Sequence, residues 1–278
     1  MADPLPREFA ESLENSRNRL GRLGSPVVFF STIESTNDVA SAIAASGDCE
    51  GAVVIADEQT AGRGRRGHTW FSPAGSGLYV SIVLTPGRAR VDRDRATTLL
   101  PLAAGVALAE AVDLMTALRI DIKWPNDLLV ARRKLGGILA EAVSAPTPTG
   151  AARALNTVDT VVVGYGINVG LMAYPPELTD RATSLESELD RPVERAQLWV
   201  ETLAAISRRY EDLLDGRFDA IVDAWRERAP ASRGARVTWN TPGGLQAGVT
   251  EGIDNRGALL IRVGDCTERI VAGELTWL

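Results

Sequence analysis

The stretch KWPNDLLVARRKLGGILAE, residues 123–141, contains the end of one strand, a turn and most of a second strand. Its proline interrupts a β ladder and forces the preceding residue to be extended, so Lys123 is expected at a strand end. The second strand carries a glycine pair, which usually permits close approach of a ligand or another backbone. Only two of the 30 basic residues are lysines, Lys123 and Lys134, and both lie here. We interpret the stretch as a candidate site at the edge of a sheet.

Strand and helix patterns surround this stretch on both sides. Short apolar runs predict strands at residues 27–30, 51–56, 78–84, 119–124, 134–142 and 157–169. Helical periodicity and an N-cap signal predict helices that begin near residue 36 and cover residues 96–118 and 192–214, with a shorter helix through residue 225. A turn rich in Pro, Thr and Gly at residues 145–150 predicts an antiparallel hairpin, and residues 170–191 are expected to form a long loop.

The composition of the chain changes after Pro230. The remaining sequence consists of short β-patterned runs separated by turns, a spacing that favours a small all-β barrel. We therefore predict an α+β protein in which a mixed sheet with packed helices is followed by a small β-barrel. The predicted boundaries are an N-terminal lead at residues 1–26, a catalytic domain at 27–230 and the barrel at 231–278.

Composition and charge exclude several classes of protein. The chain has 278 residues, a net charge of −6 and an ordinary 45% of hydrophobic residues, which excludes a disordered chain. Cys49 and Cys266 are too few for a disulfide framework, and the single histidine, His68, excludes metal sites built on several histidines. The acidic charge argues against a general nucleic-acid binder. We expect a soluble cytoplasmic protein without a membrane segment.

The segment GRGRRG, residues 62–67, matches the dinucleotide-binding fingerprint literally, but its context argues against that function. The fingerprint lies directly between a strand and a helix, whereas here Pro73, Gly75 and Gly77 follow and prevent a helix. The segment instead places three arginines on a glycine-rich backbone, which can fold over an anion. With Trp70 nearby, we favour a phosphate-handling loop over a solvated surface loop.

A second glycine-rich run, GYGIN at residues 164–168, ends an apolar strand. Its glycines again suggest close approach by a ligand, and the amide of Asn168 could read the edge of a base. Each of these signals has an alternative explanation when it is taken alone. The glycine pairs could mark β-bulges, and Lys123 could be a surface lysine before a turn.

Taken together, GRGRRGHTWFSP, KWPNDLL, KLGGILAE and GYGIN resemble the biotin–protein ligases in order and spacing. The segments STN at residues 35–37 and ATSL at 182–185, together with Gln59, add to the resemblance, which covers the chain from about residue 29 to its end. It implies a sheet of the class II aminoacyl-tRNA synthetase/biotin ligase type and a C-terminal SH3-like domain. The family's loop commonly carries a further basic residue where this chain has His68, so we assign no role to His68.

The resemblance also implies a reaction and a set of site residues. Biotin and MgATP would give biotinyl-AMP and pyrophosphate, and a lysine of a biotin carboxyl carrier protein would then accept the biotinyl group. Lys123 and Arg65 would be catalytic. The biotin site would comprise Ser35, Thr36, Asn37, Gln59, Arg63, Gly64, Arg65, Lys123 and Gly136. The ATP and adenylate site would comprise Arg63, Arg65, Trp70, Lys123, Asn126, Gly164, Gly166 and Asn168. No metal site formed by the protein itself is expected.

The resemblance further implies a biotin–[acetyl-CoA-carboxylase] ligase of the monofunctional form. The short lead is not expected to hold a winged helix, so we expect no DNA partner, no membrane partner, and a monomer or homodimer. Two other functions stay open. A lipoate–protein ligase shares the fold and the acyl-adenylate chemistry, and a non-catalytic biotin-binding module would bind without reacting.

Overall fold

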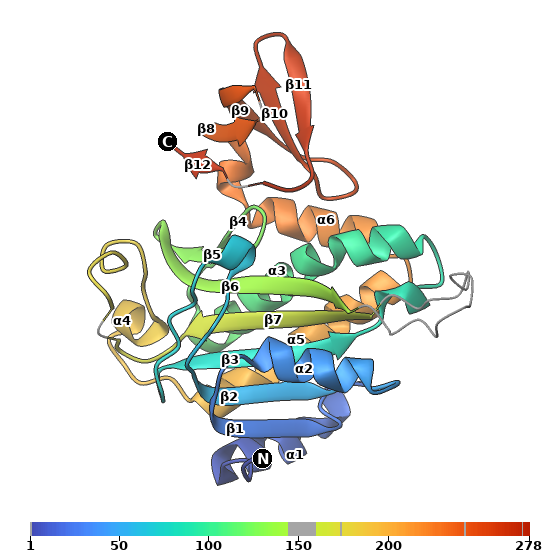
Figure 1. Ribbon diagram of the computed structural model, residues 1–278, viewed down its shortest axis with the longest axis vertical. Coiled ribbons are helices and arrows are strands. Elements are labelled where there is room, and N and C mark those ends of the chain that lie inside the picture. Colours follow the sequence, from blue (N-terminus) through green and yellow to red (C-terminus); the bar gives the residue numbers. More distant parts are fainter. Residues whose placement is uncertain (1, 144–159, 173, 242, 274) are drawn as a thin grey trace.

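A computed structural model describes residues 2–143, 160–172, 174–241, 243–273 and 275–278. Its centre is a seven-stranded sheet with the order β1-β2-β3-β7-β6-β5-β4 (Figure 1). β1 and β2 are parallel and every other neighbouring pair is antiparallel, so the predicted mixed sheet is confirmed. The strands are β1 (Val27–Ile33), β2 (Val53–Gln59), β3 (Gly77–Leu84), β4 (Asp121–Lys123), β5 (Asp127–Val130), β6 (Arg133–Val143) and β7 (Thr160–Asn168).

Helices cover both faces of this sheet (Figure 1). One face packs against α2, and the other packs against α3 and α5. The strands supply both cores because successive side chains point to opposite faces. On β2, for example, Val53 belongs to the larger core and Val54 to the smaller core beneath α2. The helices are α1 (Arg7–Ser16), α2 (Thr36–Ala45), α3 (Arg93–Thr116), α4 (Leu185–Leu189), α5 (Arg195–Leu214) and α6 (Phe218–Glu227).

Helix α3 is the longest helix among the described residues, and it covers the predicted segment 96–118 closely. By length and composition it could cross a membrane, but most of its apolar stretch is buried inside the protein. Its apolar character on all sides is therefore that of a core helix.

Two elements were not anticipated from the sequence. β5 forms within the turn expected after Pro125, and α4 forms within the segment expected to be a loop. The antiparallel pairing of β6 with β7, from Gly136↔Ile167 to Val143↔Thr160, confirms the predicted hairpin. The turn at 145–150, which was expected to connect these strands, lies outside the described residues.

The N-terminal lead packs into the main core. The Phe9 ring of α1 lies 5.5 Å from the Trp199 ring of α5, and Leu20 and Leu23 are buried. Arg19 adds a hydrogen-bonded ion pair with Glu201. The apolar residues Phe9, Leu20 and Leu23 of this otherwise polar lead therefore attach it to the core.

The C-terminal strands form a five-stranded antiparallel sheet with the order β11-β10-β9-β8-β12 (Figure 1). Among the described residues β11 and β12 are its two edges, so this sheet is not closed and the predicted SH3-like barrel is not confirmed. β12 has only two residues and pairs with β8 alone, which leaves it too short to close the sheet. The strands are β8 (Arg233–Thr241), β9 (Gly244–Ile253), β10 (Leu259–Val263), β11 (Cys266–Ile270) and β12 (Thr276–Trp277).

Candidate active site

A cavity of about 700 Å³ brings together the motifs that lie far apart in the sequence. It is bounded by the start of α2, the glycine–arginine loop, the end of β4 and the glycine-bearing parts of β6 and β7. Thirteen of the fourteen predicted site residues line it: Ser35, Thr36, Asn37, Gln59, Arg63, Gly64, Arg65, Trp70, Lys123, Asn126, Gly164, Gly166 and Asn168.

The fourteenth predicted residue, Gly136, is absent from the described lining, and its neighbour Gly137 lines the cavity instead. A Cβ on Gly136 would meet the Gly166 carbonyl and the side chains of Leu128 and Ile167. Gly136 therefore faces the apolar side of the sheet. Neighbouring residues of a strand face opposite sides of the sheet, so Gly137 is the member of the pair on the cavity side.

The start of α2 supplies three buried polar residues, Ser35, Thr36 and Asn37. The first N–H groups of a helix have no partner within the helix, and here the Thr36 N–H donates to Gln59 Oε1 at 2.9 Å. Gln59 Nε2 in turn donates to Ser72 Oγ at 3.1 Å. The end of β2 and the start of α2 are thereby joined at the wall of the cavity.

The glycine–arginine loop is held by its own backbone. Gly64 N–H donates to the His68 carbonyl at 2.7 Å, and Trp70 N–H donates to the Gly62 carbonyl at 2.8 Å. Only a short 3₁₀ turn, Arg65–Gly67, forms between them, as expected for a segment that does not start a helix. Arg66 has a φ of 56°, a left-handed conformation in which a non-glycine residue is strained.

The arginines of this loop have different surroundings. Arg63 forms an ion pair of 2.7 Å with Asp38 and approaches Glu141 at 3.4 Å. The pKa of Arg65 is lowered by burial and by the adjacent charge of Arg66, while Asp127 opposes the shift. A bound anion beside Arg65 would relieve both effects that disfavour its charge.

Trp70 lies across the glycines of the two central strands. A Cβ on Gly166 would overlap its indole nitrogen, and a Cβ on Gly137 would lie 3.5 Å from its ring. Lys134 Nζ is 5.4 Å from the ring centroid and forms a 2.6 Å ion pair with Asp127. The Trp70 Nε1 atom is buried without a hydrogen-bond partner among the described residues. The glycines are thus required for the close approach of this indole.

Lys123 is the last residue of β4, which confirms its predicted place at a strand end. Its Nζ atom lies 5.6 Å from the centroid of the Trp277 ring, a cation–π distance. The following residue, Trp124, is buried and donates its indole N–H to the Gly257 carbonyl at 3.0 Å. The lysine is therefore positioned by contacts with both sheets.

The two predicted asparagines use their amide nitrogens on the backbone. Asn126 Nδ2 donates to the Ile138 carbonyl at 2.8 Å, and Asn168 Nδ2 donates to the Thr183 carbonyl at 2.9 Å. Each residue lines the cavity. An amide NH₂ group carries two N–H donors, so the bond to the backbone uses only one of them in each residue.

Positive charge predominates in the cavity although the chain is acidic. Among the described lining residues, Lys and Arg number seven and Asp two: Arg63, Arg65, Arg66, Lys123, Arg132, Lys134 and Arg181 against Asp127 and Asp180. No group of three or more His, Cys, Asp or Glu side chains suitable for a metal is found in the described part of the chain. The site is built to bind anions.

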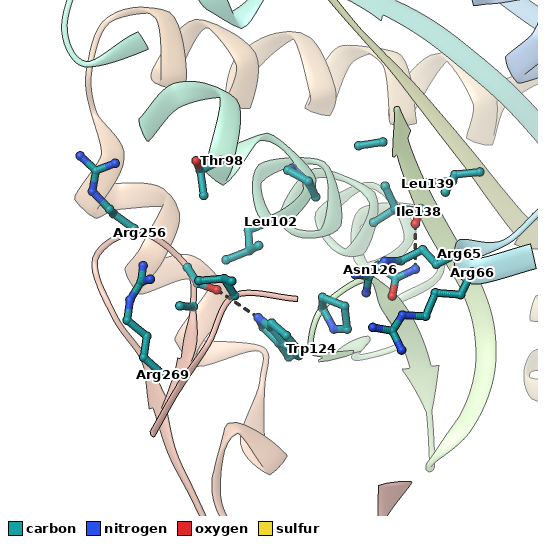
Figure 2. A pocket seen from close by; sticks show the side chains of 16 residues that line it. Arg65, Arg66, Thr98, Leu102, Trp124, Asn126, Ile138, Leu139, Arg256 and Arg269 are labelled. Carbon is teal, nitrogen blue, oxygen red and sulfur yellow. Dashed lines mark hydrogen bonds between the residues drawn. The ribbon is translucent and has the colours of Figure 1, made fainter. Parts of the chain in front are cut away.

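A smaller cavity of about 360 Å³ adjoins this site on the side of α3 and the C-terminal sheet. Figure 2 shows Trp124 between Arg65 and Arg66 on one side and Arg256 and Arg269 on the other. The loop arginines line both cavities, so they lie at the boundary between them.

Sequence reasoning missed several residues at the site. Tyr174, Arg132 and Trp277 line the cavity from outside the recognised motifs. Burial raises the pKa of Tyr174 to about 12, so its hydroxyl stays protonated at neutral pH. Trp277 could have been predicted to pack against another part of the protein, because it is an aromatic residue in a terminal β-patterned run. The sequence does not show which residue it contacts.

The fold and this site define an enzyme that binds anionic substrates, with a strand-end lysine and a glycine–arginine loop around a glycine-lined cavity. The model of the Biotin/lipoate A/B protein ligase family matches residues 29–156. The chain is 35% identical over 260 residues to the biotin–[acetyl-CoA-carboxylase] ligase of Mycobacterium tuberculosis, covering 88% of this chain and 86% of that protein. It is 31% identical to the bifunctional ligase/repressor BirA of Bacillus spizizenii, covering 91% of this chain and 74% of that protein.

Among solved structures, the chain is similar to a biotin protein ligase from Aquifex aeolicus in complex with biotin and ATP. The TM-score is 0.75 at 26% identity, and the match covers 91% of this chain and 98% of that one. The chain therefore belongs to the biotin/lipoate protein ligase family.

Proposed function

We propose that the protein joins biotin to a lysine of a biotin carboxyl carrier protein at the expense of ATP. The observation that carries the proposal is the convergence of thirteen predicted site residues on one cavity with an excess of positive charge. The relatives named as biotin–[acetyl-CoA-carboxylase] ligases support this reaction and a carboxylase subunit as the acceptor.

In the first step, a biotin carboxylate oxygen would attack the α-phosphorus of ATP, and pyrophosphate would leave. Two anions must approach each other, so fixed cations at their meeting point lower the barrier. Lys123 and Arg65 would serve in this way, and their positions in the cavity lining, on different elements, support these roles. In the second step, an uncharged lysine amine of the carrier would attack the acyl carbon, and AMP would leave.

The biotinyl-AMP formed between these steps is a mixed anhydride that must be kept from water. The loop with Arg63, Gly64 and Arg65 is suited to cover it, since it lies over the cavity and carries cations for the phosphate. A Mg²⁺ ion held by the triphosphate needs only one or two carboxylates from the protein. Asp127 and Asp180 are the carboxylates of the described lining.

Isotope exchange between pyrophosphate and ATP tests the proposal. Exchange that depends on biotin supports adenylate formation, whereas exchange that depends on lipoate would favour a lipoate ligase. Biotin binding without exchange would identify a non-catalytic module.

A cytoplasmic location, a monomeric or homodimeric state and the absence of a DNA partner remain part of the proposal. Gel filtration and DNA-binding assays with biotin test the last two.

A further inference from the structure

The last strand of the chain forms part of the wall of the large cavity. Leu275, Thr276 and Trp277 line the cavity from the C-terminal sheet. β12 pairs with β8 at Trp277↔Val237, and Val237 is fully buried. Trp277 itself is partly buried and packs against the main core. The C-terminal sheet and the core therefore hold this indole in place beside the site.

Lys123 approaches the same indole from the central sheet. Its Nζ atom lies 5.6 Å from the centroid of the Trp277 ring, within the distance at which an aromatic face attracts an ammonium. Among aromatic side chains, tryptophan attracts a cation most strongly. The contact joins the end of β4 to β12, so it connects the two sheets at the cavity.

An aromatic partner suits a lysine that must act on anions. The ammonium stands on a flexible four-carbon stem, so a neighbouring group is needed to hold it at one point. A carboxylate could hold it, but it would bring a negative charge into a cavity that binds anions. An aromatic face has no net charge and attracts the ammonium through its quadrupole. The Trp277 ring therefore restrains Lys123 without reducing the positive charge of the site.

We infer that Trp277 is a positioning residue that holds the Lys123 ammonium at the point where the two anions meet. This inference rests on the proposed function, which gives Lys123 its role in joining the biotin carboxylate to the phosphate. The ring restrains the ammonium before the substrates arrive. A preorganised cation needs less rearrangement in the transition state, so the ring should raise the rate of adenylate formation more than the affinity for biotin.

The lysine content of the chain allows the contact to be observed directly by NMR. Lys123 and Lys134 are its only lysines, so methylation with carbon-13-labelled formaldehyde labels two side chains and the amino terminus. Methylation keeps the positive charge. An aromatic ring moves the proton signal of a group above its face to higher field. Trp277→Leu should therefore move the Lys123 methyl signal to lower field, whereas the Lys134 signal, over the Trp70 ring, should not change. An unchanged Lys123 signal would overturn the inference.

Kinetics tests whether this contact matters for the reaction. In biotin-dependent pyrophosphate exchange, Trp277→Leu should lower kcat about tenfold and change the KM for biotin less than about twofold. Trp277→Phe keeps an aromatic face without the indole N–H, so it should recover kcat to within about threefold of wild type. If Trp277→Phe were as slow as Trp277→Leu, the effect would belong to the N–H group or to packing, and the inference would be overturned.

Leu278→Ala is a matched control next to Trp277. The Leu278 side chain is 69% exposed, and the change leaves its N–H bonded to the Arg236 carbonyl at 3.0 Å. This variant should keep the wild-type kcat and both lysine signals. Equal losses in Leu278→Ala and Trp277→Leu would mean that disturbance of the strand is the cause, and the inference would be overturned. Thermal unfolding checks that each variant is folded.

A double variant keeps the inference falsifiable if Trp277→Leu lowers stability. Added to Lys123→Ala, Trp277→Leu should cost no further rate, because the residue that it positions is already absent. A further loss of about tenfold in the double variant would show that Trp277 acts independently of Lys123 and would overturn the inference. A wild-type protein without biotin-dependent exchange would refute the proposed function instead, while the methyl signals would still report on the contact.

Discussion

Replacing Lys123 by alanine removes a cation from the end of β4, where the carboxylate and the phosphate are proposed to meet. The side chain is half-buried, and its Nζ atom lies 5.6 Å from the centroid of the Trp277 ring. Its charge matters most when the two anions are forced together. We therefore expect Lys123→Ala to slow adenylate formation more than it weakens substrate binding.

The magnitude follows from electrostatics at a partly solvated site. Two unit charges at 4 Å interact by about 4 kcal/mol when the effective dielectric constant is about 20. Solvent screening of a half-buried lysine reduces this value, so about 3 kcal/mol is a reasonable loss, comparable to that from deleting one preorganised donor. This energy corresponds to a rate decrease of about a hundredfold.

Biotin-dependent exchange of pyrophosphate with ATP measures the first step directly. Lys123→Arg should recover little activity, because a planar guanidinium does not occupy the position of a compact ammonium. The other lysine, Lys134, is the matched control. Its charge is already balanced by Asp127 at 2.6 Å, so Lys134→Ala should cost less than tenfold. Wild-type exchange rates in a folded Lys123→Ala protein would refute the reasoning.

Arg65→Gly should weaken retention of biotinyl-AMP, which is measured as biotin on the lysines of a bystander protein; labelling equal to wild type would contradict it. Gly164→Ala places a methyl group against Asn37 Oδ1 and should raise the KM for biotin at least tenfold in the exchange assay, whereas an unchanged KM would contradict the close packing. Arg19→Ala should lower the free energy of unfolding in urea by about 1 kcal/mol at neutral pH. The hydrogen bond from Arg19 lowers the pKa of Glu201 in the folded protein. The difference in unfolding free energy should therefore be present above the ordinary carboxylate pKa of about 4 and disappear as the pH falls through the folded pKa. A difference that persists in acid would contradict this prediction.

Local chemistry made part of the fold predictable. Pro125 placed Lys123 at a strand end because proline cannot continue a ladder, and the glycines and Pro73 after the arginines excluded a helix. Short apolar runs also indicated most strands of the mixed sheet. The β-barrel is not confirmed, because closure depends on how far a terminal strand extends and β12 is only two residues long.

The parts of the site that the sequence did not reveal depend on contacts between distant segments. The Asn37 amide is hydrogen-bonded to Glu141, 104 residues away, and to Ser81, 44 residues away, so no spacing rule connects them. Gly136 was chosen over Gly137 because a glycine pair gives no indication of which member faces the ligand. The first depends on how α2 packs on the sheet, and the second depends on strand register, which is a property of the paired sheet.

The cavity lining differs in charge from the chain as a whole, because folding brings basic residues from distant segments together. The chain carries six more acidic than basic residues, yet the described lining of the site has five more basic than acidic residues. Such a concentration of like charge is costly until an anion arrives, and the lowered pKa of Arg65 beside Arg66 is the local evidence of that cost. The cations come from the loop, from β4, from the turn before β6, from β6 itself and from the segment before α4, so the fold holds together charges from distant parts of the chain. Binding of biotin and ATP would remove this repulsion, and the ligands should therefore stabilise the loop and the sheet together rather than the loop alone.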